Sequence, residues 1–490
     1  MHSRARIIWW LHPSIESVQS PLPSHDPQDR HPDAAVKYTD VDYHVFTDAA
    51  RCLLRPGGGG SPYDRDTYRY TPFLAYILLP NALGFPLWGK LLFCAADLAV
   101  GLLVLRIARA TALLSTRPTA TAAAEAEGAA DRLARWAAAL WLLNPLVANF
   151  STRGSADSLV AALVLATVLF LRHTHTHHHA GGKKGESPSP PALALPQPVL
   201  AGVCHGLAVH VKIYPIIFSL AYLAALPLSP PATAAQTTNS CSVSSSVGAF
   251  LRRHVSWSRM AFTLASAGTF FLLTAAAYAL HGERFLHEGL LHHLTRTDNR
   301  HNFSPWFYPI YLDFEAEGRR RLLGLLAFLP QALLLLAASL LLGPRDLPLC
   351  VALQTLLFVA FNKVCVCTYI PTMWPHTPHP HDLKTQTQTP TQTQVCTAQY
   401  FAWYLSVFPA ALPTLRRRPS SRVALLLLLL WVSSLGAWLG SAYELEFLGR
   451  NTFFRTWLAS LAFLTANVAL AVALLYAWAP EDRGRRTKGE

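Results

Sequence analysis

Charged residues are scarce in this sequence. Only 14% of its 490 residues are Asp, Glu, Lys or Arg, whereas 52% are hydrophobic. A soluble domain of this size needs more polar side chains to cover its surface, and here the hydrophobic residues also fall in long runs. The composition therefore excludes a soluble globular protein and predicts an all-α polytopic membrane protein.

Several familiar motifs are also missing. The eight cysteines are scattered and several, such as Cys94 and Cys204, lie within apolar runs, so no disulfide framework is expected. Neither a Gly-x-Gly-x-x-Gly nor a Gly-x-x-x-x-Gly-Lys-Ser/Thr fingerprint is present. If the protein transfers a chemical group, the donor must therefore already reside in the membrane. The histidine runs lack acidic or Cys partners at zinc-site spacing, and no zinc site is predicted.

The hydrophobic runs predict about eleven membrane spans in a domain covering residues 88–479. Residues 1–37 are expected to be a poorly ordered N-terminal segment, 38–87 a lumenal loop, and 480–490 a cytosolic tail. Low-complexity loops are expected at 174–191, 229–246 and 368–393. The predicted spans are Trp88–Ile107, Leu133–Phe150, Asp157–Leu171, Ala194–His210, Ile213–Leu228, Met260–Leu280, Leu322–Leu342, Leu347–Phe361, Tyr400–Leu415, Val423–Leu439 and Trp457–Trp478.

The net charge of +13 comes from short basic clusters on alternate loops, such as Arg252–Arg253 and Arg416–Arg418. This distribution is typical of cytosolic loops, so we predict that these clusters face the cytosol and that the protein does not bind nucleic acid. The intervening loops are instead rich in polar and aromatic residues. They are predicted to share the opposite membrane face.

The first of these polar segments contains Asp40 and Asp42. Two carboxylates at this spacing can share a cation, or one can act as a general base while the other orients it. The alternative is a solvated pair or a helix cap, since Asp-x-Asp is common by chance. Tyr38, Tyr43 and Phe46 flank the pair and favour a site at a membrane boundary.

Two further segments carry charges towards the same face. Arg153 and Asp157 stand at the end of a predicted span and form either a local i,i+4 ion pair or part of an anion site. His210 and Lys212 lie between two spans, where Lys212 either extends its amine to the interface or binds a phosphate leaving group.

The polar segments together resemble the GPI alpha-1,4-mannosyltransferase family, the catalytic subunits of GPI mannosyltransferase I. The similar segments run through most of the chain in family order: Tyr38–Asp48, Ser61–Pro72, Leu142–Pro145, Arg153–Ser158, His210–Pro215, His292–Arg296, His301–Leu312, Phe361–Cys365, Gln399–Leu405 and Leu445–Phe453.

This resemblance implies a glycosyltransferase C fold in the endoplasmic reticulum membrane with a lumenal active site. It implies dolichyl-phosphate mannose as donor, glucosaminyl-(acyl)phosphatidylinositol as acceptor, and a small single-span stabilising subunit as partner. The family's catalytic Asp-x-Asp falls on Asp40 and Asp42, and whether they share a divalent cation is left open. Substrate-binding residues are expected in the similar segments at Arg153, Asp157, His210, Lys212, Arg296, His301, Asn302, Gln399 and Tyr400.

The sequence departs from the family pattern at three places. The family has a hydrophobic helix immediately before Asp-x-Asp that is absent here, which indicates a start that is truncated or wrongly joined. Residues 368–393 interrupt a segment that is continuous in the family and resemble a retained intron. Ser155 stands where Asn is expected.

The mechanism expected from the sequence is an inverting transfer with Asp40 as base, Asp42 orienting it, and Lys212, Arg153 and Arg296 or His301 stabilising the departing phosphate. Three alternatives stay open: another dolichyl-phosphate-mannose-dependent mannosyltransferase, a membrane lipid transporter, and a non-catalytic scaffold. A transporter often shows internal repeats, and none is found here; the charges also gather at one membrane face and not at the midplane.

Overall fold

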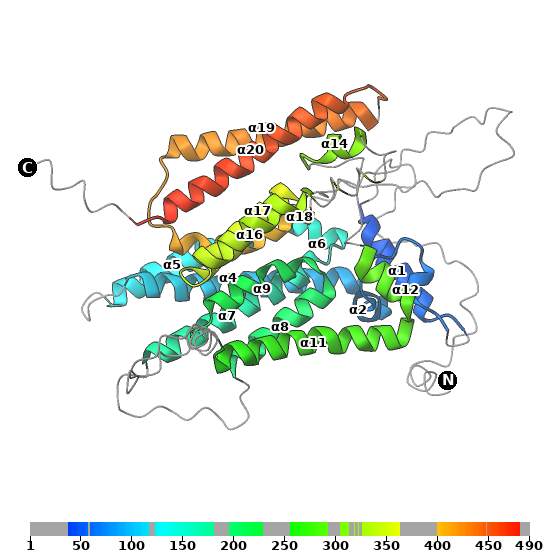
Figure 1. The fold of residues 1–490 in the computed structure, drawn as a ribbon, viewed down its shortest axis with the longest axis horizontal. Coiled ribbons are helices and arrows are strands. Elements are labelled where there is room, and N and C mark those ends of the chain that lie inside the picture. Colours follow the sequence, from blue (N-terminus) through cyan, green and yellow to red (C-terminus); the bar gives the residue numbers. More distant parts are fainter. Residues whose placement is uncertain are drawn as a thin grey trace, which may run out of the picture.

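The computed structural model describes residues 38–56, 59–116, 123–180, 196–228, 255–292, 304–312, 318, 322, 326–362, 399–446 and 448–480. Within these residues the secondary structure is helical throughout, as the sequence predicts, and no strand occurs. The longest helices run side by side along the long axis of the molecule (Figure 1). The described part of the chain thus has the architecture of a helical membrane bundle.

In the described part of the chain, four helices are long and apolar enough to cross a membrane: α4 (Trp88–Thr116), α11 (Trp257–His281), α19 (Ser421–Glu446) and α20 (Phe453–Trp478). α4 begins at the predicted residue. A fifth candidate is the broken pair α6 (Pro145–Arg153) and α7 (Asp157–Ala180), whose axes bend by 118°. The remaining apolar helices are shorter than a straight span, so the number eleven stays a prediction. They are α8 (Gln197–Val211), η5 with α9 (Tyr214–Ala225), α16 (Phe328–Leu342), α17 (Leu347–Phe361) and α18 (Gln399–Ala411).

Two predicted boundaries are wrong. The span predicted over Leu133–Phe150 is not one helix, because α5 (Ala123–Leu142) ends before Asn144, whose side chain caps α6 by accepting the N–H of Leu146 at 3.0 Å. The loop predicted from residue 174 is helical to Ala180. Neither Gly nor Pro interrupts the chain until Gly181, so nothing in that stretch ends the helix.

The predicted loop over 38–87 folds into short helices: α1 (Val41–Leu53), η3 (Pro62–Asp64), α2 (Pro72–Ile77) and α3 (Leu79–Ala82). α1 buries Tyr43, Phe46, Ala50 and Leu53, which recur at the spacing of one helix face. This segment lies at one end of the bundle (Figure 1). It therefore forms a cap over the helix ends.

The turn between α18 and α19, which carries Arg416–Arg418, lies at the opposite end of the bundle from α1 (Figure 1). It is fixed there by the C-terminus of α20, because the N–H groups of Arg416 and Arg417 both donate to the carbonyl of Ala477 at 2.8 Å. The bundle thus separates a basic turn from the Asp40 segment, and the cytosolic orientation of the basic end stays a prediction.

The closest helix packing joins α8 to α11 through Gly202 and Gly206. A Cβ atom at Gly202 would lie 2.5 Å from the carbonyl oxygen of Phe262, and one at Gly206 would lie 2.3 Å from that of Ser266. This small-xxx-small pattern allows two backbones to approach where no larger residue fits. Glycine at these positions is therefore required by packing.

We predict that Gly206→Leu destabilises the protein, because the new side chain meets backbone that cannot move aside. Overpacking of this kind costs about 1–3 kcal/mol. The measurement is the fraction of folded protein that survives heating in detergent, determined by size-exclusion chromatography. Gly268→Leu on α11 is the matched control, because a Cβ atom there meets nothing within 4 Å. Equal losses for the two variants would contradict the packing argument.

Candidate active site

Asp40 caps the N-terminus of α1. Its Oδ1 accepts the N–H of Asp42 at 3.1 Å, and its own N–H donates to the carbonyl of Arg153 at 2.8 Å. The helix-cap interpretation of Asp40 is therefore confirmed. The solvated interpretation is not, because Asp40 is only 7% exposed. A residue that only caps a helix at the surface does not need to be buried, so the burial of Asp40 favours a further role.

Burial, followed by the neighbouring charge of Asp42, raises the pKa of Asp40 to about 6, with the Asp42 N–H and the Arg153 charge limiting the rise. A carboxyl with this pKa is ionised at neutral pH yet basic enough to accept a proton. Its environment thus suits a general base.

Asp42 is held by Tyr70, whose hydroxyl donates to Asp42 Oδ2 at 3.0 Å. The Tyr70 ring packs edge-on against Phe46 with centroids 4.8 Å apart. Burial, followed by the charge of Asp42, raises the pKa of Tyr70 well above its ordinary value, so the phenol stays a proton donor. Tyr70 lies in the segment Ser61–Pro72 that the sequence analysis singled out, but no role was assigned to it.

Asp157 is the most highly bonded carboxylate of this region. It begins α7, is 2% exposed, and accepts Lys212 Nζ at 2.5 Å and the indole Nε1 of Trp403 at 2.8 Å on one oxygen. Ser155 Oγ donates to the other oxygen at 2.9 Å. The predicted partnership of Arg153 and Asp157 as an i,i+4 ion pair is replaced by these contacts.

Lys212 follows the C-terminus of α8 and does not extend freely into solvent. Its side chain is 22% exposed, and its amine lies 5.5 Å from the ring centroid of Trp403. Trp403 in turn stacks on Tyr214, with centroids 3.9 Å apart and planes 4° from parallel. Asp157 is the one hydrogen-bond partner of the amine among the described residues. Since an ammonium carries three N–H groups, donors remain for an anion.

A small cavity of about 10 Å³ joins the two halves of the site. Asp42 and Tyr70 line it from the α1 side, and Asp157 and Lys212 line it from the bundle. The volume corresponds to about one water molecule. The structure thus brings Asp42 next to the Asp157–Lys212 pair, although 115 residues separate the two aspartates in sequence.

Arg153 ends α6 beside Asp40. Its Nε is buried without a hydrogen-bond partner among the described residues. Unpaired buried guanidinium groups are uncommon, since leaving such a donor unsatisfied is costly. The position is therefore consistent with an anionic ligand that the protein alone does not supply.

Lys90 is a second residue that the sequence analysis missed. It lies in the first turn of α4, is 4% exposed, and donates to Thr39 Oγ1 at 2.8 Å. The rings of Tyr38 and Tyr43 lie 5.7 and 5.6 Å from its amine. It thereby fixes the residues that precede Asp40. A charge within an apolar run was the available signal.

The other predicted residues are placed as follows. His210 is buried against α11, where its Nδ1 lies 3.5 Å from Thr274 Oγ1, so it does not line the cavity beside Lys212. Tyr400 contacts Trp403 edge-on at 4.8 Å, next to Asp157. Gln399 begins α18. Arg296, His301 and Asn302 lie outside the described residues.

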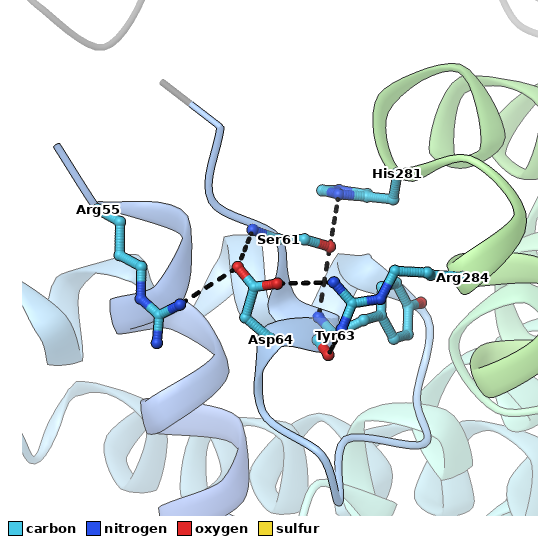
Figure 2. Close-up of polar contacts among 6 residues, drawn as sticks. All are labelled: Arg55, Ser61, Tyr63, Asp64, His281 and Arg284. Carbon is cyan, nitrogen blue, oxygen red and sulfur yellow. Dashed lines mark hydrogen bonds and ion pairs between the residues drawn. The ribbon is translucent and has the colours of Figure 1, made fainter. Parts of the chain in front are cut away.

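A polar cluster attaches the cap segment to the corner between α11 and α12 (Glu283–Phe285) (Figure 2). Ser61 Oγ lies 3.2 Å from His281 Nδ1, and Arg284 donates to Asp64 Oδ1 at 2.8 Å and to the Tyr63 carbonyl at 2.7 Å. The Ser61 N–H, and then Arg284, lower the pKa of Asp64. The cluster keeps Asp64 ionised and holds the loop that leads to Tyr70.

The donors for a metal are few in this part of the chain. Among the described residues, no group of three or more His, Cys, Asp or Glu side chains could hold a metal ion. Asp40 and Asp42 supply carboxylate oxygens, and one Asp42 oxygen already accepts Tyr70. They fit a cation that keeps most of its ligands from water or substrate phosphate, as Mg²⁺ does.

Comparison with known proteins identifies the group to which the sequence is similar. The profile of the family described as Mannosyltransferase (PIG-M) matches residues 150–375 and 383–475. The interruption at 376–382 falls inside the predicted insertion 368–393.

Curated relatives are similar over nearly the whole chain. A GPI alpha-1,4-mannosyltransferase I catalytic subunit of Danio rerio is 40% identical over 448 residues, which cover 91% of each chain. A GPI mannosyltransferase 1 of Dictyostelium discoideum is 36% identical over 90% of this chain and 85% of that protein, and one from Schizosaccharomyces pombe is 33% identical over 86% and 89%. The chain therefore belongs to the PIG-M family of mannosyltransferases.

Proposed function

We propose that this protein transfers the first mannose of the GPI anchor from dolichyl-phosphate mannose to glucosaminyl-(acyl)phosphatidylinositol, at the lumenal face of the endoplasmic reticulum membrane. The names of the relatives support the reaction. The observation that carries the proposal is the buried carboxyl of Asp40, which lies beside Arg153 and near the Asp157–Lys212 pair. A base and two cations are the groups that transfer from a sugar phosphate needs.

In this mechanism Asp40 accepts the proton of a glucosamine hydroxyl. The hydroxyl oxygen forms a bond to the anomeric carbon of mannose, and the bond from that carbon to the phosphate oxygen breaks. Dolichyl phosphate leaves with the electron pair, and the configuration inverts. General-base assistance of this kind contributes about a hundred- to ten-thousand-fold in rate.

The geometry supports a division of roles between the two aspartates. Asp42 is committed to Tyr70 through Oδ2, and its N–H fixes Asp40 Oδ1. Asp42 thereby orients the base, while the environment of Asp40 gives it the suitable pKa.

Arg153 and Lys212 are proposed to stabilise the phosphate as it departs. Both have N–H groups that the described residues do not satisfy. A well-placed donor to developing negative charge is typically worth about 3 kcal/mol. Arg296 and His301, which lie outside the described residues, are proposed for the same task.

A divalent cation at Asp40 and Asp42 would supply further neutralisation of the phosphate. A small single-span stabilising subunit is proposed as partner, on the resemblance alone. Of the alternatives, another dolichyl-phosphate-mannose-dependent transferase shares the base but not the segment His301–Tyr308, and a lipid transporter has no use for a base at one membrane face.

We predict that Asp40→Asn lowers transfer at least about a hundredfold, because the amide cannot accept the proton. The measurement is complementation of cells that lack this mannosyltransferase, scored by GPI-anchored proteins at the cell surface. Asp48→Asn is the matched control: it lies on the same helix, and its 37% exposed carboxylate pairs with Arg51 and Arg65. Near-normal rescue by Asp40→Asn would refute the assignment of the base.

The rate is predicted to depend on pH through Asp40. Since the ionised form is active and its pKa is about 6, activity in membranes should fall as pH drops through about 6 and level off above it. In Asp42→Asn the residual activity should have a lower midpoint, because a raising charge is lost. An unchanged profile in both proteins between pH 5 and 8 would exclude Asp40 as the titrating group.

We predict that EDTA changes the activity of washed membranes less than about twofold, because two side-chain cations already face the phosphate. Loss of activity that Mg²⁺ or Mn²⁺ restores would instead assign a cation to the Asp40–Asp42 pair. The control is Asp42→Asn, whose residual activity should then lose its response to the metal.

A further inference from the structure

A second cavity lies between α14 (Phe307–Leu312) and the turn that joins α19 to α20. Its volume is about 470 Å³, which is within the range of small-ligand pockets. Its walls come from α14 and from the turn around Gly449, which lie within two segments that the sequence analysis singled out, and none of its lining residues has been given a role in the Asp40 site. The residues that line it include Phe307, Tyr311, Gly449, Arg450, Asn451 and Phe453.

One wall of this cavity is a fixed aromatic surface. Tyr311 stacks on Phe453 with centroids 4.4 Å apart and planes 18° from parallel, and Phe307 lies nearly parallel to Phe453 at 6.4 Å. The chain before α14 is tied to α20, because Trp457 Nε1 donates to the Pro305 carbonyl at 3.0 Å. Stacked rings with a fixed position offer a flat apolar face to a sugar or cyclitol ring.

The rest of the lining comes from a hydrogen-bonded turn. Gly449 has φ +62°, the Arg450 N–H donates to the Glu444 carbonyl at 3.0 Å, and Thr452 Oγ1 donates to the Ser441 carbonyl at 2.8 Å. These bonds set the backbone of the turn that carries Arg450 and Asn451. The same cavity is thus lined by a guanidinium, an amide and aromatic rings.

Two arginines near this turn approach the carboxylate of Glu444. Arg455 Nη1 lies 3.2 Å from Glu444 Oε2, whereas Arg450 Nη1 lies 4.0 Å from the same oxygen and is 65% exposed. One carboxylate therefore faces two cations, and the closer one is Arg455. Arg450 keeps N–H groups for an anion, and a planar guanidinium is well suited to phosphate.

α14 and the turn between α19 and α20, whose residues line the cavity, lie at the end of the bundle that also carries α1 (Figure 1). Tyr443 is 52% and Phe454 55% exposed beside it. Exposed aromatic residues at the ends of spanning helices are typical of the boundary between membrane and water. A ligand in this cavity would therefore be level with lipid headgroups.

We infer that this cavity binds the phosphate-linked polyol headgroup of a membrane lipid, with Arg450 and Asn451 on the phosphate and Tyr311 and Phe453 against the ring. Two lipids of the proposed reaction share this chemistry: the acceptor, which contains inositol phosphate, and the donor, which contains mannosyl phosphate. The choice of these two lipids rests on the proposed function, whereas the existence of the site does not.

The test measures lipid binding to the purified full chain in phosphatidylcholine nanodiscs. Phosphatidylinositol and dolichyl phosphate are the two probes, and their dissociation constants are compared for the unaltered protein, Arg450→Gln and Tyr311→Leu. We expect Arg450→Gln to weaken binding of one probe at least about tenfold, as loss of a charge-assisted bond to phosphate implies. We also expect Tyr311→Leu to weaken the binding of phosphatidylinositol if the ring that lies against Tyr311 is the inositol ring.

Arg455→Gln is the matched control, because it removes an equal charge from the same helix-turn region at a residue that does not line the cavity. It should change binding less than about twofold. If Arg450→Gln weakens the binding of phosphatidylinositol, the acceptor is identified as the occupant. If it weakens the binding of dolichyl phosphate, the donor is identified. Equal effects of Arg450→Gln and Arg455→Gln, or no effect of either, overturn the inference.

The same measurement in the Asp40→Asn background separates this inference from the proposed reaction. Binding needs no catalysis, so the Arg450 dependence should persist there. If Asp40→Asn retains transfer, the mechanism fails while the lipid site stands. If transfer is lost as expected and Arg450→Gln leaves binding unchanged, the lipid site fails alone.

Discussion

The site depends on the solvation of one buried charge. Asp157 is almost inaccessible to water, so its carboxylate is stable only because Lys212, Trp403 and Ser155 all donate to it. These donors come from the end of α8, from α18 and from the turn before α7, which are far apart in the sequence. Removing one partner of a buried pair typically costs about 3–5 kcal/mol, because a charge is left uncompensated. The requirement to satisfy Asp157 therefore draws three helices to one point, and the Asp40 segment is bound to the same turn through Arg153.

Further polar contacts fix the segment that carries Asp40 and Asp42. Lys90 fixes the chain before Asp40, Tyr70 fixes Asp42, and the Ser61–His281 and Asp64–Arg284 contacts hold the intervening loop on α11. The first contact joins the cap segment to α4, the second lies within the cap segment, and the last two reach the corner between α11 and α12. A base that must accept a proton from a lipid-linked sugar is thereby held on a scaffold and not on a free loop. The close α8–α11 packing at Gly202 and Gly206 supports the helix that ends just before Lys212.

Much of this arrangement could be predicted from the sequence. The helical membrane class follows from composition, and the resemblance directed attention to Asp40, Asp42, Arg153, Asp157 and Lys212, which the structure brings together. Contacts over long sequence distances could not be derived, so Tyr70 and Lys90 received no role. His210 was grouped with Lys212 because they are near in sequence, but His210 lies on α8 and is buried against α11, whereas Lys212 follows the end of α8 in extended backbone. The helix break after Leu142 was missed although Asn144-Pro145 is a typical N-terminal signal. Several apolar helices are too short to span a bilayer, so the predicted number of spans depended on which of them were assumed to contact lipid.

The break between α6 and α7 has one further consequence. Gly154, at φ +104°, ends α6 and turns the chain, and a Cβ atom there would lie 2.5 Å from the Tyr43 ring. Arg153 is thus the last residue of one helix and Asp157 the first of the next. The carbonyl end of a helix favours a cation and the amide end an anion, so the two helix dipoles stabilise these charges separately. In an unbroken helix the same residues would stand one turn apart and neutralise each other. The bend therefore keeps apart two opposite charges that stand only four positions apart in the sequence. Each charge is left able to act on a different partner.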